Sequence, residues 1–417
     1  MRCLIVGNGG REHALLYAVK KSRPDVELFA TRPNAGMSGM CNAVNVSPED
    51  PRGIVDFSKK NGIDLVVAGP EVPLSLGLAN MAGEAGVNVL GPVKEGARLE
   101  ASKSFAKRLM KKQEVPTADY EIFHEPEKAA DYLKQCRYPV VIKADGLAAG
   151  KGVFIVYSQA EACGVIEEVM VKKVFGPAGI SVVIEEFLKG REVSYICLID
   201  GENVLPLASS KDHKRIYDGD TGPNTGGMGA FSPAELSPGQ EEFVVEKVIK
   251  PVLAGLRERG IVYRGFLYAG LMLTKDGIKV LEFNCRSGDP ETQPIVMRAE
   301  SDLFDAFYRA ASGTLAGVKL SWSPDAALTV VAVSKGYPGI YEKGREINGL
   351  DEIVESDDVR IFHAGTSFKD NRAVTSGGRV LNVTARGATI QEAREKVYSV
   401  IERISFDGIY YRSDIGL

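Results

Sequence analysis

The stretch Cys3-Leu-Ile-Val-Gly-Asn-Gly-Gly-Arg-Glu-His13 passes from a short apolar run through a glycine-rich turn into a helical pattern. Backbone amides at such a turn, aided by the dipole of the following helix, can bind a phosphate. A dinucleotide-binding motif would have glycine at Glu12, and no clear acidic residue ends the second strand to hold a ribose. The stretch therefore disfavours NAD binding. It fits either a single sugar phosphate or a tight turn without a ligand.

Similar apolar runs continue this pattern through the first hundred residues, at 26–30, 65–69 and 87–91. Apolar residues at helical spacing separate the first two runs. Alternating strands and helices are typical of a parallel, doubly wound sheet with right-handed crossovers. We predict this arrangement for the N-terminal part of the chain.

The rest of the chain departs from this alternation. A helix is expected to begin at Ser237, where a capping box is present, and Pro251 should kink or break it near Lys250. The pattern changes again near Ser323 and ends in an amphipathic helix. The expected strands lie at 139–144, 153–157, 181–187 and 192–200, with a hairpin at 266–273 and 278–284.

The composition excludes several classes of protein. The 417 residues carry 51 basic and 55 acidic side chains, a net charge of −4, which argues against a nucleic-acid partner. No apolar run approaches the ~18 residues of a membrane helix, and the N-terminal run is too short for a signal peptide. Six scattered cysteines fit a reducing compartment, so we expect a cytoplasmic protein without a membrane partner. Glycine is in excess, with 45 residues against an average of ~7 %.

A glycine-rich loop, Lys143-Ala-Asp-Gly-Leu-Ala-Ala-Gly-Lys-Gly152, joins two apolar strands. Its amides and ammonium groups suit a flap over a triphosphate, although it lacks the Walker spacing. A flexible hairpin with solvated lysines is the alternative. Lys143 lies among apolar residues on a strand and therefore needs an anionic partner.

Two further stretches offer polar groups to a nucleotide and a cation. The backbone near Glu185 could bind adenine and Glu192 its ribose, although exposed charges at a strand end would look the same. In strict strand alternation, one face carries Ile278, Val280, Glu282 and Asn284. The side chains of Glu282 and Asn284 could therefore hold magnesium or manganese together. Arg286 would follow on the same face and could hold a transferring phosphoryl group. A half-buried strand with salt bridges is the alternative.

The segment Lys211–Gly229 is too irregular for a strand or helix and is expected to form an ordered ligand loop. His213 lies within it and could be a general base, but no partner residue is evident. We interpret His213, His13 and His124 as structural.

Together these motifs resemble the phosphoribosylamine–glycine ligase family of the ATP-grasp superfamily over essentially the whole chain. The loop before Gly229 and the run Gly288-Asp-Pro-Glu291 are highly specific, whereas the lysine-and-glycine flap indicates only the superfamily. Ser287 departs from the family pattern, which usually has an apolar residue there. Other stretches that support the resemblance are Gly7-Asn-Gly-Gly-Arg-Glu-His-Ala14, Pro33-Asn-Ala-Gly36, Gly69-Pro-Glu-Val-Pro-Leu74, Glu282 to Glu291 and Tyr410-Tyr-Arg-Ser-Asp-Ile-Gly416.

The resemblance implies three domains and an ATP-dependent ligase of purine biosynthesis. Residues 1–100 would bind phosphoribosylamine, 101–322 would form an ATP-grasp domain with a mobile flap subdomain at about 115–190, and 323–417 a small mixed α/β domain. Glycine would be activated as glycyl phosphate and joined to 5-phosphoribosylamine, giving glycinamide ribonucleotide, ADP and phosphate. We expect a monomer or weak homodimer.

The resemblance also implies roles for individual residues. Those at ATP would be Lys103, Lys143, Gly150, Lys151, Gly152, the backbone of Glu185, Glu186 and Phe187, and Glu192 at the ribose. Glu282 and Asn284 would hold Mg²⁺ or Mn²⁺, Arg286 would steady the acyl phosphate, and Asp212 and Asp289 would face the glycine ammonium group. The phosphoribosylamine residues would be Gly9, Gly10, Arg11, Asn34 and Glu71, and Lys214 would also bind substrate.

Two other classes of protein stay open at this point. Another ATP-grasp enzyme, such as a biotin-dependent carboxylase component, would share the flap and the metal-binding strand but would not need the Gly-Asp-Pro-Glu run. A regulatory nucleotide-binding module would have little use for Glu282, Asn284 and Arg286 together.

Overall fold

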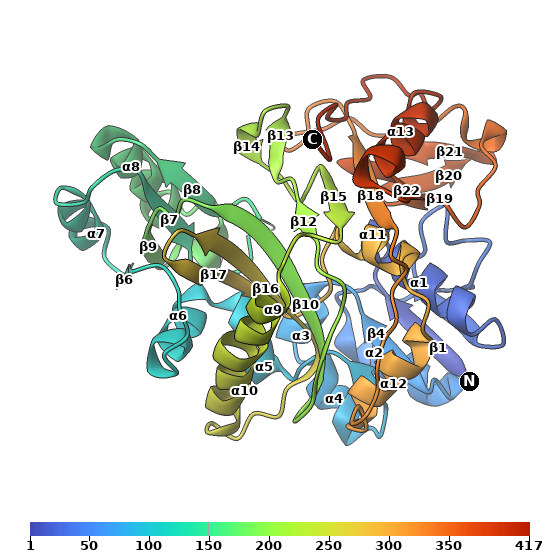
Figure 1. The fold of residues 1–417 in the computed structure, drawn as a ribbon, viewed down its shortest axis with the longest axis horizontal. Helices are drawn as coiled ribbons and strands as arrows, with labels where there is room; N and C mark the ends of the chain where they lie inside the picture. The colour runs from blue at the N-terminus through green and yellow to red at the C-terminus, as the bar shows by residue number, and fades with distance from the viewer. Residues whose placement is uncertain (149) are drawn as a thin grey trace.

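A computed structural model describes residues 1–148 and 150–417 of the chain (Figure 1). It begins with a five-stranded parallel sheet in the order β3-β2-β1-β4-β5, as the apolar runs predict. The three-residue strand β3 is too short to stand out in the sequence. The strands are β1 (Arg2–Val6), β2 (Glu27–Thr31), β3 (Asn42–Val44), β4 (Leu65–Ala68) and β5 (Val89–Leu90).

Helices cover both faces of this sheet because successive side chains of a strand point to opposite faces. Cys3 and Ile5 pack in one core with the helix after β1, while Leu4 and Val6 pack in a second core with Ile54. The sheet is therefore doubly wound. Its helices are α1 (Gly10–Ser22), α2 (Pro51–Asn61), α3 (Glu71–Ser75) and α4 (Leu78–Glu84).

A smaller antiparallel sheet, in the order β6-β9-β7-β8, lies at the left of Figure 1, apart from the N-terminal sheet. It has its own hydrophobic core, in which Ile142 and Ile184 are buried. Helices α5 (Lys94–Ala101) and α6 (Lys103–Lys112) connect the two regions. The elements of this smaller region are β6 (Tyr120–Phe123), α7 (Pro126–Leu133), β7 (Val140–Ala144), β8 (Val153–Val156), α8 (Gln159–Ile166) and β9 (Val182–Glu186).

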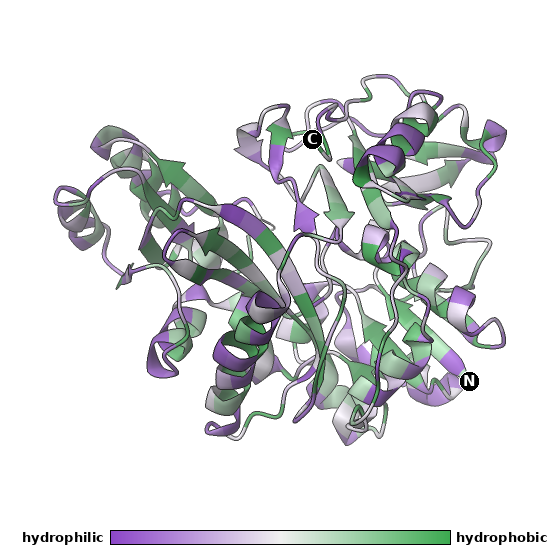
Figure 2. Ribbon diagram, in the orientation of Figure 1, coloured by the Kyte–Doolittle hydropathy of each residue, from purple (hydrophilic) through white to green (hydrophobic). Residues whose placement is uncertain are grey.

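A third sheet, in the order β11-β10-β16-β17, crosses the middle of the molecule. Helices α9 (Pro238–Val244) and α10 (Lys250–Arg257) pack against it, and Figure 2 shows hydrophilic residues on their outer side. A π-helical turn at Val245–Ile249 joins the two helices, where we expected a kink or break. The wider turn accommodates Pro251, whose ring would clash with a carbonyl of a regular helix. The strands are β10 (Arg191–Asp200), β11 (Val204–Pro206), β16 (Arg264–Thr274) and β17 (Gly277–Asn284).

Strand β17 contains an irregularity that corrects the predicted side-chain parity. Gly270 of β16 pairs with Glu282 while Leu271 pairs with Val280, so Leu281 is an extra residue in a β-bulge. The bulge moves Glu282 to the face opposite Val280, which is buried in the core. Val280 and Glu282 therefore do not share a face, contrary to the strict alternation that we assumed.

The fourth sheet, in the order β12-β15-β18-β22-β19, takes strands from both sides of the expected boundary at residue 322. The segment 211–229, expected to be neither strand nor helix, contains β12, the hairpin β13–β14 and the first residue of β15. Short strands among glycines and charges lack a period that sequence reasoning can detect. The strands are β12 (Lys211–Asp212), β13 (Arg215–Tyr217), β14 (Thr221–Asn224), β15 (Gly229–Ser232), β18 (Ala326–Val333), β19 (Val359–His363) and β22 (Arg379–Gly387).

The remaining elements complete the C-terminal part of the chain. Helices α11 and α12 lie between β17 and β18 along the chain, and α13 packs on β18 and β22. No helix within the described residues is both long and apolar enough to cross a membrane. These elements are α11 (Thr292–Met297), α12 (Leu303–Ser312), the hairpin β20 (Thr366–Lys369) and β21 (Arg372–Thr375), and α13 (Ile390–Ile401).

Candidate active site

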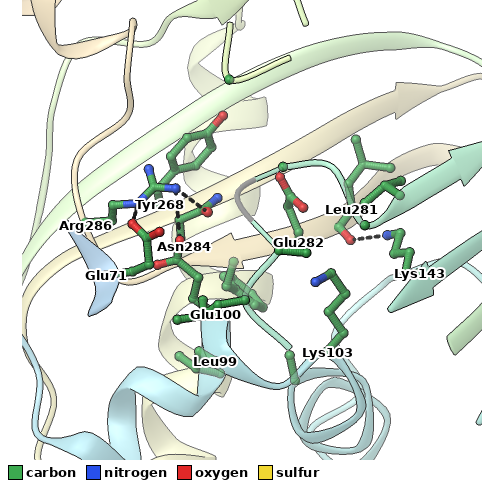
Figure 3. Close-up of a pocket in the computed structure, with 18 of the residues that line it drawn as sticks. Glu71, Leu99, Glu100, Lys103, Lys143, Tyr268, Leu281, Glu282, Asn284 and Arg286 are labelled. Atoms are coloured by element: carbon green, nitrogen blue, oxygen red, sulfur yellow. Dashed lines mark hydrogen bonds and ion pairs between the residues drawn. The ribbon is translucent and has the colours of Figure 1, made fainter. Parts of the chain in front are cut away.

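Two adjoining cavities, of about 360 Å³ and 450 Å³, lie where the second and third sheets meet the N-terminal region. They share Lys143, Glu185, Leu281 and Glu282 in their walls, so they form one cleft with two compartments. Figure 3 shows the first compartment, with Glu282 between Asn284 and Lys143. The residues that the sequence predicted for a nucleotide and for a cation are thus brought together.

Glu282 and Asn284 reach the first compartment because of the bulge at Leu281. Burial alone would raise the pKa of Glu282, but the ammonium groups of Lys214 and Lys143 contribute to lowering it, so the carboxylate is charged. Two oxygen donors fit Mg²⁺, which proteins hold through one or two carboxylates together with water and substrate phosphates. No cluster of three or more His, Cys, Asp or Glu side chains arranged for a metal occurs among the described residues.

Three lysines surround the compartment next to Glu282: Lys107 and Lys143 are buried and Lys103 is half-buried. The carboxylate of Glu185 lies between Lys143 and Lys107, at 3.0 Å from each ammonium group. Lys143 also donates to the carbonyl of Leu281, and Lys103 donates to the carbonyl of Gly146, both at 3.0 Å. Glu185 is thus the anionic partner that Lys143 requires. Three ammonium groups against one carboxylate leave a net positive charge that suits phosphate.

Burial makes the proton on Lys103 and Lys107 easier to lose. It lowers the pKa of Lys103, and it lowers the pKa of Lys107 to about 8 although Glu185 opposes this shift. An anion bound in the cleft would favour the charged form of both.

The second compartment is largely apolar. Val153, Ile155, Leu188 and Met272 line it, and the ends of β9 and β10 form its rim. Glu192 stands at that rim, 3.4 Å from Lys214. The apolar side chains of this compartment suit a purine base. Glu186, which pairs with Lys279 at 2.7 Å, and Phe187 also line this compartment.

Arg286 is the centre of a group of charges on the opposite side of the first compartment. Its guanidinium lies 3.0 Å from both Glu71 and Glu100 and 3.3 Å from Asn284 Oδ1. Burial raises the pKa of Glu100 to about 6, while Arg286 helps to hold the pKa of Glu71 low. Arg11 lies nearby and donates to the carbonyl of Ser287 at 3.3 Å. Sequence reasoning missed Glu100, because no motif marks its position in α5.

Arg379 is a second site residue that sequence reasoning missed. It reaches the compartment from β22 and pairs with Asp289 at 2.7 Å. It also donates to the carbonyl of Gly226 at 2.7 Å, which connects β22 to the loop before β15. Asp212 is paired as well, with Lys214 at 3.0 Å. Both carboxylates expected at the glycine ammonium group therefore already have a cation.

The glycine-rich turn before α1 lies against the C-terminal sheet. A Cβ on Gly10 would lie 2.2 Å from Asn382 Nδ2, so only glycine fits there. The amide of Gly9 donates to Glu12 at 2.6 Å. Gly9 and Gly10 are not in the walls of the two compartments, whereas Arg11 is.

Asn34, expected to bind substrate, has its side chain occupied by the protein itself. Its amide group donates to the carbonyls of Asn8 and His363, at 2.9 and 2.7 Å, and its oxygen accepts from the amide of Met37. The sequence cannot show this, because His363 is distant in the chain. The structure does not bring Asn34 into the cleft.

The glycine-rich flap approaches the cleft through Gly150 and Gly152, whereas Ala149 lies outside the described residues. Gly150 has φ +75°, a conformation that favours glycine. Lys151 was expected at ATP, but its ammonium group donates to the carbonyl of Pro338 at 2.7 Å and is absent from the walls of both compartments.

Buried histidines lie near the cleft in neutral form. Burial lowers the pKa of His213 to about 4 and that of His363 to about 4. It lowers the pKa of His13 to about 3, and His13 Nδ1 accepts the backbone N–H of His363 at 2.9 Å. None of the three lines the first compartment, although His213 lines the second.

Comparison with known proteins places the whole chain in one family. Models of phosphoribosylglycinamide synthetase match residues 1–100 (N domain), 101–292 (ATP-grasp domain) and 327–417 (C domain). Phosphoribosylamine–glycine ligase of Caldanaerobacter subterraneus is 47 % identical over 100 % of this chain and 99 % of its own length. The chloroplastic ligase of Arabidopsis thaliana is 47 % identical over 99 % of this chain and 82 % of its own length.

Solved structures agree with this assignment. The crystal structure of phosphoribosylamine–glycine ligase from Thermotoga maritima has a TM-score of 0.86 and 36 % identity, covering 99 % of this chain and 100 % of that one. A biotin carboxylase domain from Hydrogenobacter thermophilus, with a TM-score of 0.76 and 19 % identity, covers 98 % of this chain and 91 % of that domain and shares the fold alone. The chain therefore belongs to the phosphoribosylamine–glycine ligase family of ATP-grasp enzymes.

Proposed function

We propose that the protein joins glycine to 5-phosphoribosylamine at the expense of ATP, in purine biosynthesis. The products are glycinamide ribonucleotide, ADP and phosphate. The observation that carries the proposal is the cleft in which buried lysines, the pair Glu282 and Asn284, and Arg286 meet. Membership of the ligase family supports the choice of substrates.

ATP would occupy both compartments of the cleft. Its base fits the apolar compartment, next to the backbone of residues 185–187 and with Glu192 at the ribose. Its phosphates fit between Lys103 and Lys143, under the flap glycines Gly150 and Gly152. Lys151 is not included, because its ammonium group is held by Pro338.

Glu282 and Asn284 would hold the divalent cation, Mg²⁺ or Mn²⁺. When bound, the cation neutralises phosphate charge, which is the main requirement of phosphoryl transfer. The lowered pKa of Glu282 keeps this carboxylate ionised and available as a ligand. The oxygen donors fit either metal.

The reaction needs two bond-forming steps in this cleft. A carboxylate oxygen of glycine attacks the γ-phosphorus, and the bond from that phosphorus to the bridging oxygen breaks to release ADP. The amine of phosphoribosylamine then attacks the carbonyl carbon of glycyl phosphate, phosphate leaves and the nitrogen loses a proton. Arg286 lies where it can steady the acyl phosphate, and the flap would keep water away from it.

Phosphoribosylamine would approach from the N-terminal sheet. The amide of Gly10 at the start of α1 and the guanidinium of Arg11 suit its phosphate, whereas the amide of Gly9 already donates to Glu12. Glu71 and Lys214, both in the wall of the first compartment, suit its polar sugar. Asn34 would support this turn rather than contact the substrate, because its amide is saturated.

The proposal extends to the organisation of the protein. Domains at 1–100, 101–322 (with a flap subdomain at about 115–190) and 323–417 are supported by the ranges of the family models, although the fourth sheet crosses residue 322. We also propose a cytoplasmic protein that acts as a monomer or weak homodimer.

The test is ADP release measured by an enzyme-linked assay with each substrate omitted in turn. We expect ADP only when glycine and phosphoribosylamine are both supplied, with glycinamide ribonucleotide formed in equal amount. Bicarbonate in place of glycine is the control for carboxylase chemistry. Equal ADP release with bicarbonate would overturn the ligase proposal.

A further inference from the structure

The acidic side chains around the first compartment differ in whether a cation already neutralises them. Glu71 and Glu100 pair with Arg286, and Glu185 pairs with Lys107 and Lys143. Asp212 and Asp289 are also paired, as described above. Among the carboxylates in the described part of this wall, Glu282 and Glu291 alone have no ion-pair partner.

Glu291 is a buried carboxylate with only 2 % of its surface exposed. Its Oε1 accepts hydrogen bonds from the hydroxyl of Tyr268 at 2.7 Å and from Ser194 Oγ at 3.1 Å. Its Oε2 lies close to Gly288, where a Cβ would be 2.4 Å away. The third sheet thus holds one oxygen, while the other packs against Gly288, whose lack of a side chain makes room for it.

Within the described residues no cation pairs directly with Glu291, although the charges of Lys214, Arg286 and Arg379 act on it at longer range. Burial and the nearby carboxylate of Asp212 raise the pKa of Glu291, and Lys214 only partly opposes them. Lys214 is already held by Asp212 at 3.0 Å. A buried carboxylate without its own cation is costly unless a ligand supplies one.

Glycine has an ammonium group that can supply this charge. Its carboxylate must face Arg286 and the Glu282–Asn284 pair, where phosphoryl transfer takes place, so its nitrogen points to the remaining wall of the same compartment. Asp212 and Asp289 already share their charge with Lys214 and Arg379, so they would attract a further ammonium group less strongly. Glu291 has no direct ion-pair partner, in the part of the chain that the structure describes, with which to share its charge.

We propose that Glu291, rather than Asp212 or Asp289, binds the ammonium group of glycine and thereby selects an amino acid over other small carboxylates. This inference rests on the proposed function. It makes Glu291 a specificity-determining residue, with Tyr268 and Ser194 as positioning residues. Glu282 is left to the cation.

The variant that tests this is Glu291→Gln, because the amide keeps the shape and can still accept hydrogen bonds from Tyr268 and Ser194. We expect its KM for glycine to rise about 100-fold, the order expected for a lost hydrogen bond to a charged group. Its KM for ATP and for phosphoribosylamine should change less than about threefold. Glu242→Gln, on the exposed face of α9, is the matched control.

Glycolate supplies a measurement on the wild-type protein. It has a hydroxyl in place of the ammonium group, so we expect it to inhibit with a Ki about 100-fold above the KM for glycine. In Glu291→Gln this preference should shrink to less than about tenfold. Tyr268→Phe removes a positioning hydroxyl but keeps the charge, so it should retain most of the preference.

Each failure has a distinct meaning. If the wild-type protein forms no ADP with glycine and phosphoribosylamine, the proposed function itself is wrong. If it does, but Glu291→Gln leaves the KM for glycine unchanged, only the assignment of Glu291 is wrong. A wild-type protein that binds glycolate as well as glycine would overturn the assignment even if Glu291→Gln did not fold. If Tyr268→Phe lost the preference for glycine over glycolate to the same extent as Glu291→Gln, the assignment of Glu291 would also be wrong.

Discussion

Lys143 and Lys107 form equally short ion pairs with Glu185, but we expect them to contribute unequally to ATP binding. Each ammonium group lies 3.0 Å from a different oxygen of this carboxylate, and all three side chains are almost fully buried. Lys107 is also held by Thr117 Oγ1 at 2.7 Å and lies over the ring of Tyr120. Replacing each lysine by methionine therefore separates stability from function.

The stability effect follows from the second cation. Breaking a buried ion pair costs about 3–5 kcal/mol when it leaves a bare charge. Here the other lysine still neutralises Glu185, so the cost should approach that of one hydrogen bond to a charged group, about 2 kcal/mol. We expect this loss in the free energy of unfolding for Lys143→Met and for Lys107→Met alike. The double variant should lose more than the sum, by about 1 kcal/mol or more.

The kinetic effect should distinguish the two lysines. Loss of a phosphate contact of about 2 kcal/mol lowers kcat/KM for ATP about 30-fold in Lys143→Met. Lys107→Met should change it less than about threefold, because Glu185 and Thr117 hold its ammonium group. Urea unfolding and ADP release at varied ATP measure the two quantities. An equal kinetic loss in Lys107→Met would refute the reasoning.

Three further predictions concern the metal, pH and the flap. Glu282→Gln should raise the Mg²⁺ concentration for half-maximal rate about 100-fold while the unfolding midpoint without metal changes little; an unchanged half-maximal Mg²⁺ concentration would contradict this role. His13, with its pKa lowered to about 3, stays neutral in the folded protein while the unfolded chain binds a proton below about pH 6.5. Stability should therefore fall as pH is lowered from about 6.5 toward 3, and His13→Gln should reduce the slope by about 1.4 kcal/mol per pH unit in urea unfolding. If the free energy of unfolding of His13→Gln changes with pH as steeply as that of wild type, His13 is not the source of this pH dependence. Lys151→Met should leave the KM for ATP within about twofold, and a tenfold rise would restore its expected role at ATP.

The strands and helices with clear periodicity were predictable, whereas local irregularities were not. The apolar runs near Cys3 and Leu65 predict the parallel sheet because buried strands are short and continuous. The bulge at Leu281 leaves no trace in the sequence, since an extra residue looks like ordinary alternation. Its effect was nevertheless decisive, because it turns Glu282 away from the core and into the cleft.

Site residues that belong to a motif were predictable, and those that arrive from distant segments were not. Arg286 and Asn284 lie on one strand end, where spacing alone brings them together. Arg379 reaches Asp289 from 90 residues away, and Glu100 reaches Arg286 from the end of a helix. Such contacts depend on how the sheets pack, which one sequence does not reveal.

The sheet that crosses residue 322 has a consequence for fragments of the protein. A chain ending there would keep β15 (Gly229–Ser232) but lose β18, whose residues 327–330 pair with it. The unsatisfied amides and carbonyls of β15 would become a template for pairing between molecules, and Asp289 would lose Arg379. The C-terminal part therefore protects the ATP-grasp part from aggregation as well as completing its cleft.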